Sequence, residues 1–99
     1  MSQAAGGRSR QARQTLDRKK KSFREELREL KEEIHMAQQD STSRQRLDRI
    51  DRDSERMTTR LEQVIQSFEK CIELEESPEA REDIELELTD FEEWARGEL

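Results

Sequence analysis

The sequence predicts an all-α protein, a long antiparallel helical hairpin or coiled coil with a shorter third helix folded back on it. Charged residues make up 44% of the 99 residues, whereas hydrophobic residues make up 29%. Over long stretches the apolar side chains recur in steps of three and four, which is the spacing of one helix face. Three Gly, one Pro and no Tyr are too few turn and strand residues for a sheet protein.

The first helix is predicted from about residue 9 to residue 40. Residues 1–8 are expected to form a flexible tail, because they hold two of the three glycines and no large apolar side chain after Met1. The helix carries a heptad pattern that Lys20 interrupts once. Its apolar positions are Leu16, Phe23, Leu27, Leu30, Ile34 and Ala37.

A break is expected at residues 40–43, where four short polar side chains compete for backbone hydrogen bonds. Residues 42–45 match a capping box, which starts a new helix. The apolar register also slips between Ala37 and Leu47. A turn is the preferred interpretation. One continuous bent helix is the alternative, because neither Gly nor Pro occurs at the break.

The second helix is predicted over residues 43–75. Its stripe is Leu47, Ile50, Ser54, Met57, Leu61, Val64, Phe68 and Cys71. Ile65 and Ile72 widen the stripe in the C-terminal half, so that half is expected to pack against more than one neighbour.

The third helix is predicted over residues 78–96. Pro78 is favoured at a first helical position after a Ser cap, and Gly97 is a helix stop. The stripe of this helix contains Ile84, Leu88, Phe91 and Ala95, with Trp94 beside it. If the third helix folds back, it lies on the C-terminal half of the second helix, which has more apolar side chains.

The stripes of the first two helices leave more apolar face than one short third helix can cover. We therefore expect self-association, most simply as a dimer, or binding of a partner helix. The predicted core and oligomer-interface residues are Leu16, Phe23, Leu27, Leu30, Ile34, Leu47, Ile50, Met57, Leu61, Val64, Phe68, Ile72, Ile84, Leu88, Phe91 and Trp94.

The residues for catalysis and metal binding are scarce. One His and one Cys exclude a two-His site, a multi-Cys site and an internal disulfide within one chain. His35 is expected on the surface and Cys71 in the core. We predict no enzyme activity, no catalytic, cofactor or metal site, and no small-molecule ligand. The absence of a signal peptide and of a membrane-spanning apolar run predicts an intracellular, most simply cytoplasmic, protein.

Charge is distributed unevenly along the chain. Residues 1–25 contain eight basic and two acidic side chains, whereas residues 76–99 contain two basic and ten acidic ones. Three hypotheses follow: the basic start binds a polyanion such as nucleic acid, it attracts the acidic end within one chain or between neighbours, or it is only a solvated surface. The candidate polyanion-binding residues are Arg8, Arg10, Arg13, Arg18, Lys19, Lys20, Lys21 and Arg24.

Three segments in this order resemble the amino-terminal coiled-coil region of BEL/Pao-type retrotransposon polyproteins. They are the basic stretch 18–23, the stretch 61–69 with its Leu-Glu and Phe-Glu pairs, and the acidic stretch 90–93. The resemblance covers residues 13–96 and implies a structural, Gag-like assembly segment. The capsid domain, zinc knuckle, protease and polymerase of that family have no counterpart here.

The expected function is that of a non-enzymatic, self-associating coiled-coil scaffold that mediates protein–protein interaction. The alternative is a nucleic-acid-binding or packaging protein that uses residues 8–24. A third hypothesis is an adaptor that binds one helix of an unrelated partner.

Overall fold

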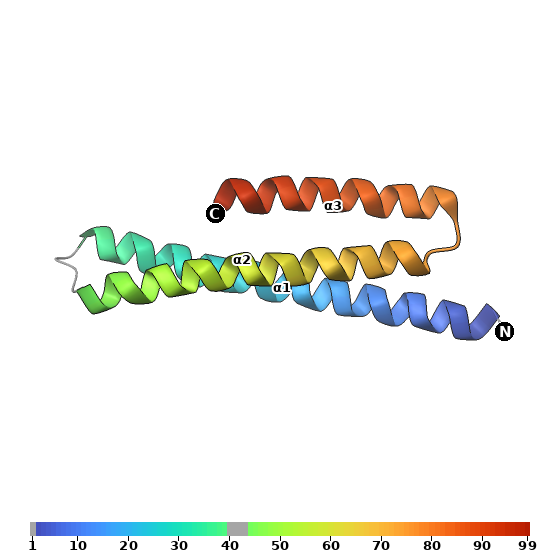
Figure 1. Cartoon of the computed structure of the whole chain (residues 1–99), viewed down its shortest axis with the longest axis horizontal. Helices are drawn as coiled ribbons and strands as arrows, with labels where there is room; N and C mark the ends of the chain where they lie inside the picture. Colours follow the sequence, from blue (N-terminus) through green and yellow to red (C-terminus); the bar gives the residue numbers. More distant parts are fainter. Residues whose placement is uncertain (1, 40–43) are drawn as a thin grey trace.

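A computed structural model of the chain describes residues 2–39 and 44–99. Three helices follow one another: α1 (Ser2–Gln39), α2 (Arg44–Leu74) and α3 (Pro78–Glu98). The first two form an antiparallel hairpin, and α3 folds back along α2 (Figure 1). The molecule is elongated, with extents of 61 × 21 × 15 Å. The predicted all-α fold, a hairpin with a shorter third helix, is confirmed.

The first helix begins earlier than the sequence pattern indicated. It starts at Ser2, so the flexible tail expected over residues 1–8 is wrong for residues 2–8, and residue 1 lies outside the described residues. Extending an existing helix costs far less than nucleating one, and alanines favour it. A Gly in a helix interior costs only about 1 kcal/mol relative to Ala, so Gly6 and Gly7 do not stop the helix.

The connection between α1 and α2 falls on residues 40–43, which lie outside the described residues, as do two members of the predicted capping box. The helices on either side lie next to each other and run in opposite directions (Figure 1). This arrangement is incompatible with the alternative of one continuous bent helix.

The junction between α2 and α3 has the predicted capping. Ser77 is the N-cap in an extended conformation, and its hydroxyl accepts a 3.3 Å hydrogen bond from the backbone N–H of Ala80. Pro78 opens the helix, where its missing N–H leaves no intrahelical hydrogen bond unmade. The helix passes Gly97 and ends at Glu98.

The core lies along the seam between the three helices. Its buried residues are Leu16, Phe23, Leu27, Leu30, Met57, Leu61, Val64, Phe68, Cys71, Phe91 and Ala95. The partly buried side chains packed against it are Ala12, Ile34, Ile50, Ile65, Ile84 and Leu88. As expected, the C-terminal half of α2 contacts both other helices. Most of the predicted stripe is therefore buried within a single chain.

Two residues that were predicted for the core or interface are exposed. Leu47 is 50% exposed, because α3 ends before it reaches the start of α2. Trp94 is 41% exposed, although its ring contacts two core phenylalanines. Ile72 is half-buried. Ser67, which the apolar pattern did not mark, is buried.

Among residues 2–39 and 44–99, no helix combines the length and the hydropathy that crossing a bilayer requires.

Candidate interaction surfaces

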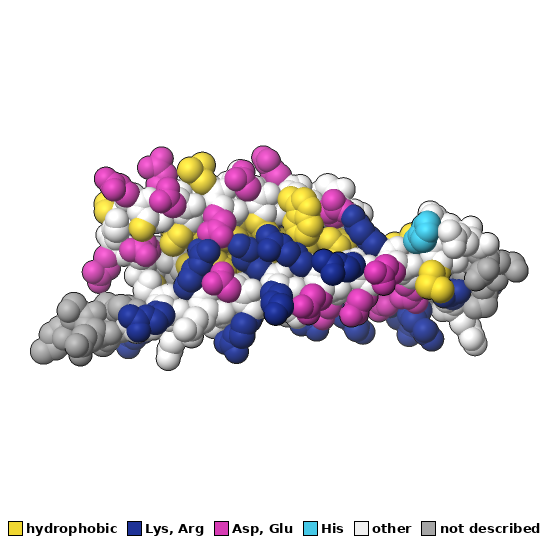
Figure 2. Space-filling view, turned by 180° about the vertical axis from the view of Figure 1, so that it is seen from behind, with side chains coloured by type: hydrophobic (Ala, Val, Ile, Leu, Met, Phe, Trp, Pro, Cys, Tyr) yellow, Lys and Arg dark blue, Asp and Glu magenta, His cyan; other side chains and the backbone are white. Residues whose placement is uncertain are grey.

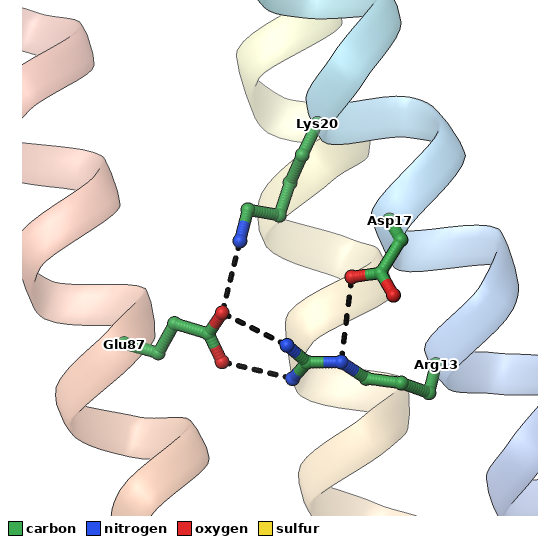
Figure 3. A network of polar contacts seen from close by, with 4 residues as sticks. All are labelled: Arg13, Asp17, Lys20 and Glu87. Atoms are coloured by element: carbon green, nitrogen blue, oxygen red, sulfur yellow. Dashed lines mark hydrogen bonds and ion pairs between the residues drawn. The ribbon is translucent and has the colours of Figure 1, made fainter.

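A network of charged side chains joins α1 to α3 (Figure 3). The guanidinium of Arg13 donates two hydrogen bonds to the carboxylate of Glu87, at 2.8 and 3.0 Å. The ammonium of Lys20 donates a third to Glu87 at 2.9 Å, and Asp17 lies 3.3 Å from Nε of Arg13. Bidentate, charge-assisted pairs of this kind are among the stronger polar contacts in proteins. The network therefore fixes the register of α3 on α1.

This network changes the protonation equilibria of its members. The hydrogen bonds from Arg13, supported by Lys20, lower the pKa of Glu87 from 4.5 to about 2, against the opposing effect of partial burial. The hydrogen bond to Glu87 in turn raises the pKa of Arg13. Glu87 is therefore ionised at neutral pH and holds both cations.

Four aromatic rings lie next to the network, where α3 meets the hairpin. Phe91 of α3 lies 5.7 Å from Phe23 of α1 and 5.8 Å from Phe68 of α2, centroid to centroid. Lys20 lies over the Phe68 and Phe91 rings, and the Arg24 guanidinium lies over Phe91 and Trp94. Cations over aromatic faces gain electrostatic attraction. The long side chains of α1 thus cover the aromatic cluster.

The structure divides the predicted basic segment into two groups. Arg13, Lys20 and Arg24 contact α3. Attraction between the basic start and the acidic end therefore occurs within one chain. The sequence contains a sign that these three cations lie at the edge of the buried face of α1. Each stands three residues before an apolar heptad position, Leu16, Phe23 or Leu27. Figure 2 shows Lys and Arg side chains in a row along the middle of this face, with acidic side chains above them.

The remaining members of the basic segment are exposed, and no ion pair in the described structure joins them to α3. They are Arg8, Arg10, Arg18, Lys19 and Lys21. They lie on different sides of α1, because successive residues of a helix differ by 100° in direction. The structure therefore does not bring all eight predicted cations together on one surface.

A second surface lies beyond the C-terminal end of α3. We call residues 28–39 and 44–57 the distal half, and residues 2–27, 58–74 and α3 the proximal half. In the distal half α3 contributes only its C-terminal end, where Glu98 pairs with Lys31, so Ile34 and Ile50 stay partly buried and Met36 and Leu47 are at least half exposed.

A trough of about 270 Å³ marks where the distal half begins. Its lining residues are Leu27, Leu30, Lys31, Ile34, Ser54, Glu55, Thr58, Glu98 and Leu99. Lys31 pairs with Glu98, so these two charges neutralise each other. Ser54 and Thr58 are small, which allows close approach of another chain. The trough continues the line of α3 along the hairpin.

The single Cys and the single His lie where they were expected. Cys71 is 3% exposed, and burial raises the pKa of its thiol, which disfavours the reactive thiolate. His35 is exposed, and its Nε2 lies 3.1 Å from the side-chain amide of Gln39. Within the described parts of the chain, no cluster of His, Cys, Asp or Glu is suited to hold a metal ion.

Comparisons with protein-family models, curated proteins and solved structures find no match to this chain. The resemblance to the retrotransposon coiled-coil region therefore stays a prediction.

Proposed function

We propose that the protein is a self-associating assembly module and that two copies join through their distal halves. The observation that carries the proposal is that α3 covers only part of the hairpin. It has 21 residues against 38 in α1, or about 31 Å against about 57 Å at 1.5 Å per residue. The apolar stripes of α1 and α2 continue past its end.

The uncovered side chains are of the kind that a second helical layer buries. Met36 is 53% exposed and Leu47 is 50% exposed, and Ile34 and Ile50 of the same half are only partly buried. Burying a large apolar side chain fully contributes roughly 1.5–3 kcal/mol. A second copy laid over this stripe in the opposite direction supplies the same side chains, as two-fold symmetry requires.

Charge also favours a second copy at this surface. Residues 28–39 and 44–57 contain seven Lys or Arg and seven Asp or Glu, so the distal half has no net charge, whereas the whole chain carries −6. Two distal halves can therefore approach without mutual repulsion. The two-fold arrangement leaves both copies of α3 outside the contact, at the ends of the assembly.

Sedimentation equilibrium over a range of concentrations tests the proposal. The wild type is expected to show a reversible monomer–dimer equilibrium. Leu47→Gln removes an exposed Leu from each copy, at about 1 kcal/mol per side chain, so the dimer Kd should rise roughly 30-fold. The helical signal of the monomer should change little, because Gln is a good helix former.

Leu86→Gln is the matched control. Leu86 is 60% exposed on α3 and lies outside the distal half. It should leave the dimer Kd within a factor of about two. A monomer at every concentration overturns the proposal, and so does an equal loss in both variants, which places the contact elsewhere.

A further inference from the structure

A cationic groove runs along the seam of α1 and α2 in the proximal half, and no α3 residue lines it. Two adjoining hollows of about 550 and 350 Å³ form it and share Thr15 and Lys19. Its charged side chains are Arg8, Arg18, Lys19, Arg60 and Lys70. No carboxylate of the described residues lines it, although Asp and Glu make up 25 of the 99 residues.

We propose that this groove binds a single strand of nucleic acid through its phosphates, without recognising bases. Arg and Lys neutralise phosphates, and side-chain amides and hydroxyls donate hydrogen bonds to phosphate oxygens. Such donors lie among the cations along the groove, and those that are not buried are Gln11, Thr15, Ser22, Gln63 and Gln66. The groove thus presents charge and hydrogen-bond donors together along one line.

The other side chains of the groove indicate what does not bind there. Its one aromatic residue, Phe23, is 1% exposed, so it offers no ring for stacking against a base. Val64 is equally buried and Leu74 is partly buried, so the groove has no fully exposed large apolar side chain to enter a membrane. Recognition is therefore electrostatic, and the single line of cations along the seam faces one sugar–phosphate backbone.

Nearby carboxylates compete for only part of this charge. Arg60 lies 3.4 Å from Glu26, and Lys70 lies 3.8 Å from Glu73. Within the described residues, no carboxylate pairs with Arg8, Arg18 or Lys19. No α3 residue lines the groove, so the acidic side chains of that helix do not face the bound strand.

This site differs from the contiguous basic segment 8–24 of the sequence. It includes Arg60 and Lys70 from α2, and it lacks the three α1 cations that contact α3. It lies in the proximal half, so it does not depend on the proposed dimer contact.

Titration of a fluorescein-labelled uridine 20-mer with the full chain, at several salt concentrations, tests the proposal. Log K should fall linearly with log[salt], with a slope of about −0.7 per neutralised phosphate. The double variant Arg18→Gln, Lys19→Gln should make that slope shallower by about 1.4. Lys70→Gln should make it shallower by about 0.7, although Lys70 is remote from the basic segment in sequence.

The matched control is Arg10→Gln, Lys21→Gln. It also removes one Arg and one Lys from exposed positions of α1, but neither residue lines the groove. The slope should stay within about 0.3 of the wild type. An equal effect of both double variants, or no effect of Lys70→Gln, overturns the groove and favours a diffuse basic surface.

Trp94 gives a second readout because it is the only Trp, it belongs to α3, and it does not line the groove. Its emission should not change when the oligonucleotide binds. Quenching of Trp94 overturns the proposal in favour of the α1–α3 side. Binding to vesicles that contain phosphatidylserine, with no binding to the oligonucleotide, overturns it in favour of an anionic membrane.

Discussion

The proximal and distal halves of the hairpin carry the same type of apolar repeat but bury it to different extents. Of the buried core residues in the described chain, only Leu30 and Met57 belong to the distal half. In the proximal half the third helix closes the seam, and side chains such as Phe68 and Leu61 lose nearly all exposure. In the distal half the equivalent positions, Ile34 and Ile50, stay partly buried. The number of packed neighbours, rather than the heptad pattern, therefore decides where the core forms.

The largest expected effect tests this difference in core packing. Leu61→Ala should lower the free energy of unfolding by about 2–5 kcal/mol, because it opens a cavity in a fully packed seam. Ile50→Ala on the same helix should cost roughly half as much, since Ile50 is only partly buried. Urea unfolding at concentrations where the protein is monomeric measures both. Equal losses would mean that the two halves are packed alike.

The charged network of the proximal half should make stability depend on pH. Glu87→Gln should lower the free energy of unfolding at pH 7 by about 1–2 kcal/mol, because Lys20, whose side chain is 13% exposed, loses its carboxylate. Folding lowers the pKa of Glu87, so its stabilisation is complete above pH 4.5 and is lost as the pH falls toward about 2.

Urea unfolding of the wild type and Glu87→Gln between pH 7 and pH 2 measures this effect. The two stability curves should converge over the acid limb. Glu85→Gln, an exposed neighbour with no ion pair in the described structure, is the control and should leave the curve nearly unchanged. Curves that stay parallel down to pH 2 would show that Glu87 does not contribute the ionised contact.

Loss of the N-cap of α3, which lies in the proximal half, should lower the stability of the protein by a smaller amount. Ser77→Ala removes the hydroxyl that accepts from the Ala80 N–H and should cost about 1 kcal/mol. Pro78→Ala should be close to neutral, because a first helical position does not require Pro. Thermal unfolding followed by circular dichroism compares the two. A larger loss for Pro78→Ala than for Ser77→Ala contradicts this assignment of the cap.

The smallest effect tests whether the proximal end of α1 is helical. A Cβ added at Gly7 meets no atom within 4 Å, so Gly7→Ala should stabilise the protein by about 0.4–1 kcal/mol. Helix content at 222 nm and the urea midpoint should both rise slightly. Gly97→Ala, which also meets no atom, is a comparison at the end of α3. If neither quantity changes for Gly7→Ala, residues 2–8 are not helical in solution.

Local chemistry predicted much of the fold. The Ser77–Pro78 pair marks the start of α3, and the three–four spacing identifies nearly all of the core. The start of α1 was missed because a Gly pair is a weak helix breaker when a helix already exists on one side. Leu47 was placed in a core or interface because its spacing is correct, but no third helix reaches it.

The candidate surfaces were less predictable, because they depend on how the three helices pack against one another in space. The roles of Arg13, Lys20 and Arg24 depend on which side of the hairpin α3 occupies, and a charge count along the chain contains no such information. Arg60 and Lys70 join the groove only because α1 and α2 lie antiparallel. Because Arg60 and Lys70 are far in sequence from residues 8–24, the charge pattern along the chain did not identify them as part of the same surface.

The contact between α1 and α3 has a consequence for the order of folding. Close backbone packing in the described structure joins α1 to α2 and α2 to α3, the pairs that are adjacent along the chain. The first and third helices meet through side-chain contacts, such as those of Arg13 and Phe23. Chains whose contacts are mostly local fold quickly, because little loop-closure entropy is lost before contacts form. The two successive hairpins should therefore form early, and the contacts across α1 and α3 should form only when both are in place.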